Sequence, residues 1–192
     1  TLPLGPADLA VIQGLPGIAR ASLVVQAREE MRRDTVRRLA MVRGTLGASG
    51  PAPELAAGRA LAPADSLSRV VVLNHLLARR LAAPAAPASL VGEAVTIAGD
   101  TLRVVGVLAD APGPPVGTAD APYRLAEALA ARRGTPLPSI AAEAARIEDV
   151  APAQQAIERH LTSRLRVGQA AGWRSRFSVE TYRARAEQAA QG

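Results

Sequence analysis

Two stretches near the start of the chain alternate between apolar and polar residues with a period of two. The first covers Ile18–Glu30 and the second covers Thr35–Arg43. Successive side chains of a β-strand point to opposite faces, so this period predicts two strands. The polar stretch Arg32–Asp34 between them predicts the turn of a long, charged β-hairpin. A short helix is expected just before it, over Ala7–Leu15, where Gly and Pro residues follow.

The middle of the chain predicts a second set of short elements. The apolar run Arg69–Leu73 is typical of a buried strand, and Asn74–Leu81 is expected to be a helix. Gly99-Asp100 tolerates the positive φ of a tight turn and lies between the strand predictions Ala94–Ile97 and Thr101–Leu108. We expect irregular structure over 55–65 and a loop over 82–89.

The last third has a helical period as well as strand-like runs. The stripe that begins at Val150 predicts a helix over Val150–Leu165, with Asp149 as its N-cap and Pro152 in its first turn. The other expected elements are Tyr123–Arg133 as a strand that runs into a helix, strands over Ser139–Ile147 and Phe177–Thr181, and a terminal helix over Arg183–Ala190.

Two Gly- and Pro-rich stretches, 47–53 and 112–117, mark boundaries within this α+β chain. We predict an outer β-α-β-type lobe built from both chain ends, 1–46 and 117–192. The residues between them, 47–116, are expected to form a small inserted β-rich lobe.

Composition narrows the function classes. The chain has 192 residues, 48% hydrophobic, which suits a folded protein with a core, and no Cys, which excludes disulfides and thiolate metal sites. Its net charge is +6, and all 23 basic residues are Arg. No apolar stretch reaches the roughly 20 residues of a membrane helix. The first residue is Thr1, and we expect the chain to be a fragment of a longer protein.

Searches for catalytic and ligand-binding motifs yield no candidates. There is no Gly-rich phosphate loop and no Gly-x-Ser-x-Gly elbow. The two histidines, His75 and His160, are far apart in sequence, and neither belongs to a metal-binding pair. The neighbouring acids Glu29-Glu30 and Glu148-Asp149 fall at a strand end and a helix start. We therefore assign no catalytic, cofactor-binding or metal residues and expect no enzyme activity.

The arginines of the predicted hairpin support an alternative function. They are Arg28, Arg32, Arg33, Arg37, Arg38 and Arg43. A β-ribbon with this charge suits a nucleic-acid-binding module. Single-strand binders also stack bases on aromatic side chains, and none of the chain's few aromatics lies on the hairpin. A solvated hairpin is the simpler interpretation.

Five motifs in order resemble the periplasmic core domain of MacB-like and FtsX-like ABC transporter permeases. They are Leu15–Ile18 before an alternating strand, Gly58-Arg59 with Asp65, the Ser68–Asn74 strand, a hairpin with Leu90–Glu93, Val95, Ile97, Gly99 and Val104–Leu108, and the late strand Ser139–Ile147 with the helix Val150–Leu165. The resemblance spans nearly the whole chain. The Pro-rich stretch 109–122 departs from the pattern.

The resemblance implies a non-catalytic domain on the periplasmic or extracellular face of the bacterial cytoplasmic membrane. It lies between the first and second membrane helices of its parent chain, while ATP binds a separate nucleotide-binding domain. Two permease copies relay ATP-driven motion outward, often through a periplasmic adaptor protein or towards cargo. We do not expect nucleic acid among the partners, and we expect no cofactor in this domain.

Overall fold

The computed structural model describes residues 4–47, 52–113, 115–134 and 138–170; in the last helix, α4 (Val150–Ala170), it describes the side chains as far as residue 164. The fold is α+β with a mixed sheet, which confirms the predicted class. The chain forms two compact units, 1–22 with 140–192, and 23–139. Within the described part of the chain, no helix combines the length and the apolar character needed to cross a membrane.

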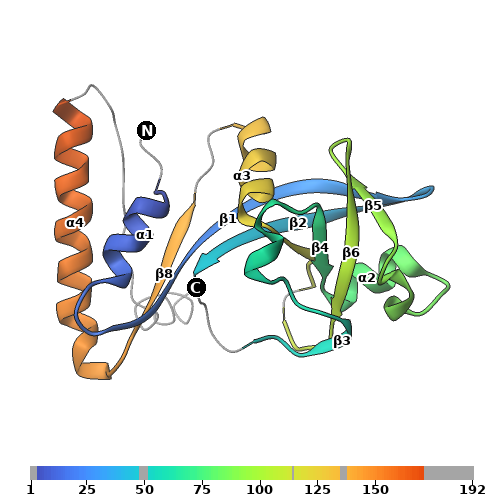
Figure 1. The fold of residues 1–192 in the computed structure, drawn as a ribbon, viewed down its shortest axis with the longest axis horizontal. Coiled ribbons are helices and arrows are strands. Elements are labelled where there is room, and N and C mark those ends of the chain that lie inside the picture. Colours follow the sequence, from blue (N-terminus) through green and yellow to red (C-terminus); the bar gives the residue numbers. More distant parts are fainter. Residues whose placement is uncertain (1–3, 48–51, 114, 135–137, 171–192) are drawn as a thin grey trace, which may run out of the picture. The chain divides into compact units, whose positions relative to one another are not determined.

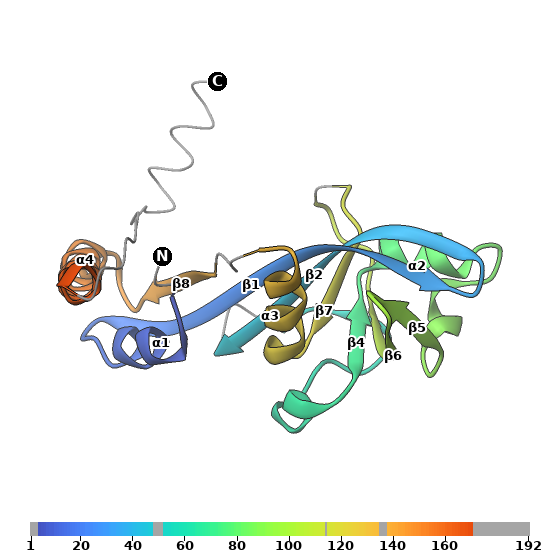
Figure 2. The ribbon, with the colours of Figure 1, turned by 90° about the horizontal axis from the view of Figure 1, so that it is seen from above.

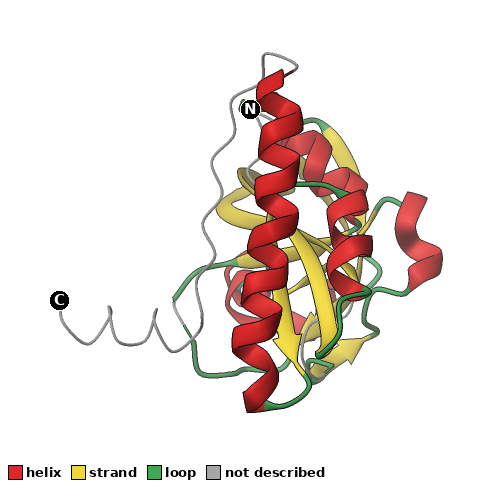
Figure 3. Ribbon diagram, turned by 90° about the vertical axis from the view of Figure 1, so that its left-hand side faces the viewer, coloured by secondary structure: helices red, strands yellow, loops and turns green. Residues whose placement is uncertain are grey.

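The first unit contains α1 (Pro6–Gln13), the start of β1 (Ile18–Arg33), β8 (Ser139–Ala144), the 3-10 turn η3 (Ile147–Asp149) and α4 (Val150–Ala170). β1 pairs with β8, and α1 lies beside α4 (Figures 1 and 3). Pro6 at the first helical position suits the start of α1. Leu9 and Ile12 of α1 are buried, as is Leu161 of α4.

The turn between α1 and β1 depends on Gly17. Its φ of +81° lies in the left-handed region that favours glycine, and a Cβ there would lie 2.8 Å from the Asp149 Cβ. The carbonyl of Gly17 accepts a hydrogen bond from the Ala145 amide at 2.8 Å. The turn is therefore fixed against the end of β8 and the start of α4.

The second unit is built around strands in the order β2, β7, β4, β6, β5, β1, and β1 also pairs with β2, so the order closes on itself (Figures 1 and 2). β2–β7 and β4–β6 are parallel, and β4–β7, β5–β6 and β1–β5 are antiparallel. The strands after β1 are β2 (Val36–Gly47), β3 (Leu55–Gly58), β4 (Val70–Leu73), β5 (Ala94–Ile97), β6 (Asp100–Leu108) and β7 (Thr118–Ala121).

Two α-helices, α2 (His75–Ala82) and α3 (Tyr123–Arg132), and two 3-10 turns, η1 (Pro63–Leu67) and η2 (Pro87–Leu90), complete this unit. The largest fully buried side chains come from strands and helices together: Leu23, Met31, Val42, Leu73, Leu77, Leu81, Leu90, Ile97, Leu102 and Leu129. α3 packs closely on β2 at Gly44, where a Cβ would lie 2.7 Å from the Ala126 Cβ. Leucines and small residues thus form the core.

The structure differs from the sequence-based predictions in several elements. β7 ends before Pro122, and the helix begins at Tyr123, so the predicted strand-to-helix run at Tyr123–Arg133 is a helix preceded by a strand. Part of the predicted irregular stretch 55–65 is strand β3, because it pairs with β6. The second hairpin turns at Ala98 and Gly99, both with positive φ, one residue earlier than predicted. The predicted elements Phe177–Thr181 and Arg183–Ala190 lie outside the described residues.

The two compact units divide the chain at residues 22 and 139, whereas the predicted lobes divide it at 46 and 117. The difference arises from the hairpin. β2 pairs with β7, and the end of β1 pairs with β5, so most of the hairpin packs with the middle of the chain. One unit does combine both chain ends, and the other is formed by the residues between them.

Candidate interaction and scaffold sites

The motif Gly58-Arg59 with Asp65 closes the segment between β3 and η1. Arg59 donates two hydrogen bonds to the Asp65 carboxylate, at 2.6 and 2.9 Å, and the Ala62 amide donates a third at 2.8 Å. These donors, Arg59 first, lower the pKa of Asp65 from its ordinary value of 3.8 to about 2. The pair is therefore charged at neutral pH and holds the 59–65 segment in a loop.

Two glycines allow this loop to lie directly on β6. A Cβ on Gly58, which has a φ of +72°, would collide with the backbone carbonyl of Val105. A Cβ on Gly106 would likewise collide with the carbonyl of Arg59. The Arg59 amide donates to the Val105 carbonyl at 2.9 Å. The Gly58-Arg59 and Asp65 motif thus brings two backbone segments into direct contact, and the Arg59–Asp65 ion pair holds them there.

Asn74 connects three elements at the start of α2. Its side-chain oxygen accepts from the amides of Leu77 and Thr118, both at 3.0 Å, so it caps α2 and holds the start of β7. Its side-chain nitrogen donates to the Val116 carbonyl at 2.8 Å. The sequence predicts a helix that begins at this residue. It does not predict that the Asn74 side chain also holds the start of β7.

Two buried carboxylates have cationic partners. The Glu29 carboxylate accepts from Arg133 at 3.0 and 2.9 Å, and these hydrogen bonds lower the pKa of Glu29 although burial raises it. Asp8 is 2% exposed and contacts His160 at 2.9 Å and Arg164 at 2.7 Å. Both sites tie distant segments together, as expected of buried charges that are paired.

The residues weighed as chemical candidates lie in structural contacts. His75 Nδ1 lies 3.6 Å from Asp110, and His160 belongs to the Asp8 contact in the other unit. Among the described residues, no three His, Asp or Glu side chains gather as a metal site would require. Glu29 is buried while Glu30 is exposed, which agrees with their strand alternation.

Asp149 directly precedes α4, at the predicted N-cap position. Its carboxylate accepts from Arg146 at 3.0 and 3.1 Å. The neighbouring Glu148 also lies near Arg146, 3.4 Å away. This pair of acids therefore belongs to the η3 turn.

The arginines of the β1–β2 hairpin do not form one cluster. Arg33 points towards α2 and donates to the Leu81 carbonyl, and Arg43 pairs with Asp120. Arg37 lies 3.6 Å from Glu30. Arg28 and Arg32 face solvent. The hairpin thus uses some arginines to join elements and presents others outward.

The comparisons with known proteins agree on one family. The model of the MacB-like periplasmic core domain matches residues 1–160. The extracellular domain of the noncanonic ABC-type transporter YknZ from Gram-positive bacteria is similar, with a TM-score of 0.69 at 16% identity, covering 84% of this chain and 83% of that one. A search of curated protein sequences finds no match.

Two further solved structures share the fold. The periplasmic region of MacB from Actinobacillus actinomycetemcomitans has a TM-score of 0.65 at 18% identity, covering 85% of this chain and 75% of that one. A domain of a putative permease protein from Porphyromonas gingivalis has a TM-score of 0.53 at 17% identity, covering 79% and 74%. The chain belongs to the MacB-like periplasmic core domain family and is an extracytoplasmic domain of an ABC-type transporter permease.

Proposed function

We propose that this domain is a non-catalytic module of an exporter-type permease that relays ATP-driven motion from the membrane to partners outside it. The family match over residues 1–160 carries the proposal. In this proposal the first and second membrane helices of the parent chain flank the domain. ATP binds a separate nucleotide-binding domain, and this domain holds no cofactor.

Rigid connections within each unit support a mechanical role. In the second unit, the Arg59–Asp65 pair, Asn74 and Glu29 each join segments that are separated in sequence. In the first unit, the Asp8 contacts join α1 to α4. Elements that are packed in one fixed arrangement move as rigid bodies and do not deform continuously. A domain that transmits force needs this rigidity.

The partners in this proposal are protein surfaces. A second permease copy completes the working dimer, and a periplasmic adaptor protein or the cargo receives the motion. The domain's role is to couple these contacts to movement of the membrane helices. The extracytoplasmic location disfavours the nucleic-acid alternative, because the hairpin then lies outside the compartment where nucleic acid is found.

Phosphate release from ATP tests the non-catalytic role. The purified chain should release no more phosphate than buffer, whereas the parent permease assembled with its nucleotide-binding domain should hydrolyse ATP. A mock purification from cells that lack the chain is the control, because a contaminating ATPase would appear there as well. Hydrolysis that copurifies with the folded chain and disappears when the chain is removed with antibody would overturn the proposal.

A further inference from the structure

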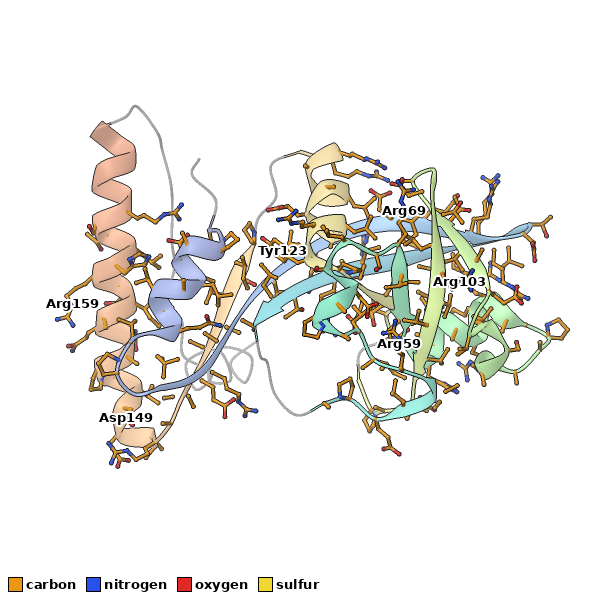
Figure 4. All side chains as sticks on the ribbon, in the orientation of Figure 1. Arg59, Arg69, Arg103, Tyr123, Asp149 and Arg159 are labelled. Carbon is orange, nitrogen blue, oxygen red and sulfur yellow. The ribbon has the colours of Figure 1, made fainter. Side chains whose placement is uncertain are left out.

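One outward face of the second unit carries arginines over a surface made by β1, β5 and β6. Arg103 is exposed on β6, where Figure 4 labels it, and Arg28 and Arg32 are exposed on β1. Thr96 and Thr101 lie between them on β5 and β6. We call these five residues the arginine face. It is separate from the motifs that hold the fold together.

Strand register places these side chains on the same side of the sheet. Arg32 is opposite Thr96, and Thr96 is opposite Thr101. Arg103 is opposite Ala94, two residues from Thr96. Directly opposed residues share a face, as do residues two apart along a strand. Arg28 lies four residues before Arg32, so it faces the same way about 13 Å along the strand.

The opposite side of the sheet is the one that packs inward. Arg33, the neighbour of Arg32, points the other way and donates to the Leu81 carbonyl at the end of α2. The side chains that alternate with the arginine face, such as Met31 and Leu102, are fully buried. The arginine face is therefore a solvent-facing surface of a firmly packed sheet.

The charge of this face is not neutralised within the described structure. Among the described residues, no carboxylate lies within ion-pair distance of Arg28, Arg32 or Arg103. Glu30 is the acid nearest in sequence on that side of β1, and it lies 3.6 Å from Arg37. Among the described residues, Arg28, Arg32 and Arg103 thus have no ion-pair partner, and Glu30 is the acid that shares their side of β1.

Elsewhere in the chain, arginines hold carboxylates through two parallel hydrogen bonds. Arg20 does so with Glu143, Arg43 with Asp120, and Arg133 with Glu29. The planar guanidinium matches a carboxylate in this geometry, and arginine is enriched at protein interfaces for that reason. An acidic protein surface can form the same pairs with the arginine face.

The surroundings favour a protein over a lipid bilayer. A membrane-binding surface combines basic residues with aromatic or large apolar side chains that insert between headgroups. The only aromatic among the described residues is Tyr123, which is buried. The arginine face instead carries threonines beside its arginines, and none of its five residues is aromatic or large and apolar. Arginine is enriched at protein interfaces.

We propose that the arginine face binds an acidic segment of another extracytoplasmic protein. The spacing of Arg28 and Arg32 matches carboxylates four residues apart on an extended partner segment, about 13 Å. The proposal depends on the proposed function only for the choice of an extracytoplasmic protein. The ATP-hydrolysis assay does not involve these residues, so either proposal can fail without the other.

Binding to a labelled acidic peptide tests this proposal. The probe is a twelve-residue peptide of alternating Glu and Thr, measured by fluorescence anisotropy with the purified chain at low and at physiological salt. Vesicles of phosphatidylcholine with phosphatidylglycerol and a short DNA duplex are measured in parallel. We expect the peptide to bind, with affinity that falls as salt rises, and vesicles and DNA to bind more weakly.

A matched pair of variants locates the binding surface. In the face variant, Arg28, Arg32 and Arg103 are changed to Gln, and in the control variant, Arg79, Arg80 and Arg124 are changed to Gln, so both lose three charges. The control residues are exposed on α2 and α3. We expect the face variant to weaken peptide binding at least tenfold and the control variant less than twofold.

Two results would overturn the proposal. Equal weakening in both variants would show that net charge alone attracts the peptide. Tighter binding of vesicles or DNA than of the peptide would assign the face to a different partner. Far-ultraviolet circular dichroism and thermal unfolding confirm that each variant is folded, and single changes at Arg32 and Arg103 replace the triple variant if it is not.

Discussion

Changing Asp65 to Asn removes one charge from the Arg59–Asp65 pair while keeping the size of the side chain. The carboxylate of Asp65 is 10% exposed and accepts three hydrogen bonds, whereas the Arg59 side chain is 52% exposed. The Asn side chain keeps one oxygen that accepts hydrogen bonds. Its NH₂ group replaces the other carboxylate oxygen and therefore faces an N–H donor, with which it cannot form a hydrogen bond. We therefore expect Asp65→Asn to lower the free energy of unfolding.

The pKa of Asp65 sets the size of this effect. The difference between its ordinary value of 3.8 and about 2 corresponds to about 2–2.5 kcal/mol at most. Solvent screens the half-exposed Arg59, which reduces the expected loss to about 1 kcal/mol. In a chain of this length, that loss lowers the Tm by about 2–4 °C.

The dependence on pH identifies the ion pair as the cause. Folding lowers the pKa of Asp65, so its contribution is complete above about pH 4, declines as the pH falls, and is lost below about pH 2. Urea unfolding of wild type and Asp65→Asn at pH 7, 4 and 2.5 measures this contribution. We expect the difference between the two proteins to be largest at pH 7 and to shrink towards pH 2.5.

Asp110→Asn provides the matched control. Asp110 is 79% exposed and lies 3.6 Å from His75, which is too far for a hydrogen bond. The substitution should change the free energy of unfolding by less than about 0.5 kcal/mol at neutral pH. A deficit of Asp65→Asn that stays constant from pH 7 to 2.5, or one matched by Asp110→Asn, would refute the role given to the Arg59–Asp65 pair.

Three further substitutions test other connections in the fold. Gly106→Ala should destabilise the chain by about 3 kcal/mol, because its Cβ would meet the Arg59 backbone, whereas Gly113→Ala, with open space around it, should be nearly neutral in urea unfolding. Asn74→Ala should cost about 1–3 kcal/mol and speed hydrogen exchange at both the start of α2 and β7; a change confined to α2 would disprove the link to β7. Asp8→Asn should raise hydrogen exchange in α1 before the rest of its unit, and unchanged exchange there would count against the contact with α4.

The alternation of apolar and polar residues, together with the turn and capping residues, predicts the elements whose structure depends mainly on their own sequence. The β1–β2 hairpin follows from strict alternation, and β4 and α2 follow from an apolar run before a capping Asn74. β3 and β7 could not be predicted in this way. Their sequences, Leu55–Gly58 and Thr118–Ala121, are short and rich in alanine, and they are strands because β6 pairs with β3, and β2 and β4 pair with β7.

The charged contacts likewise divide into those that the local sequence predicts and those that depend on the tertiary fold. Alternation along β1 predicts that Glu29 and Glu30 face opposite ways, as the structure has them. It does not predict that Arg133, 104 residues later, closes over Glu29. The Arg59 and Asp65 motif is visible in the sequence, but the close approach to β6 that explains Gly58 and Gly106 depends on the tertiary fold.

Relay of motion is the central proposal, and distances between two copies of this domain in the intact transporter test it most directly. The chain has no cysteine, and Leu67 is 78% exposed, so Leu67→Cys accepts a spin label with little disturbance. Double electron–electron resonance in lipid nanodiscs then compares nucleotide-free and ATP-trapped states. We predict that the label-to-label distance distribution shifts when ATP is trapped. Identical distributions, while labels on the nucleotide-binding domains report their closure, would contradict a relay through this domain.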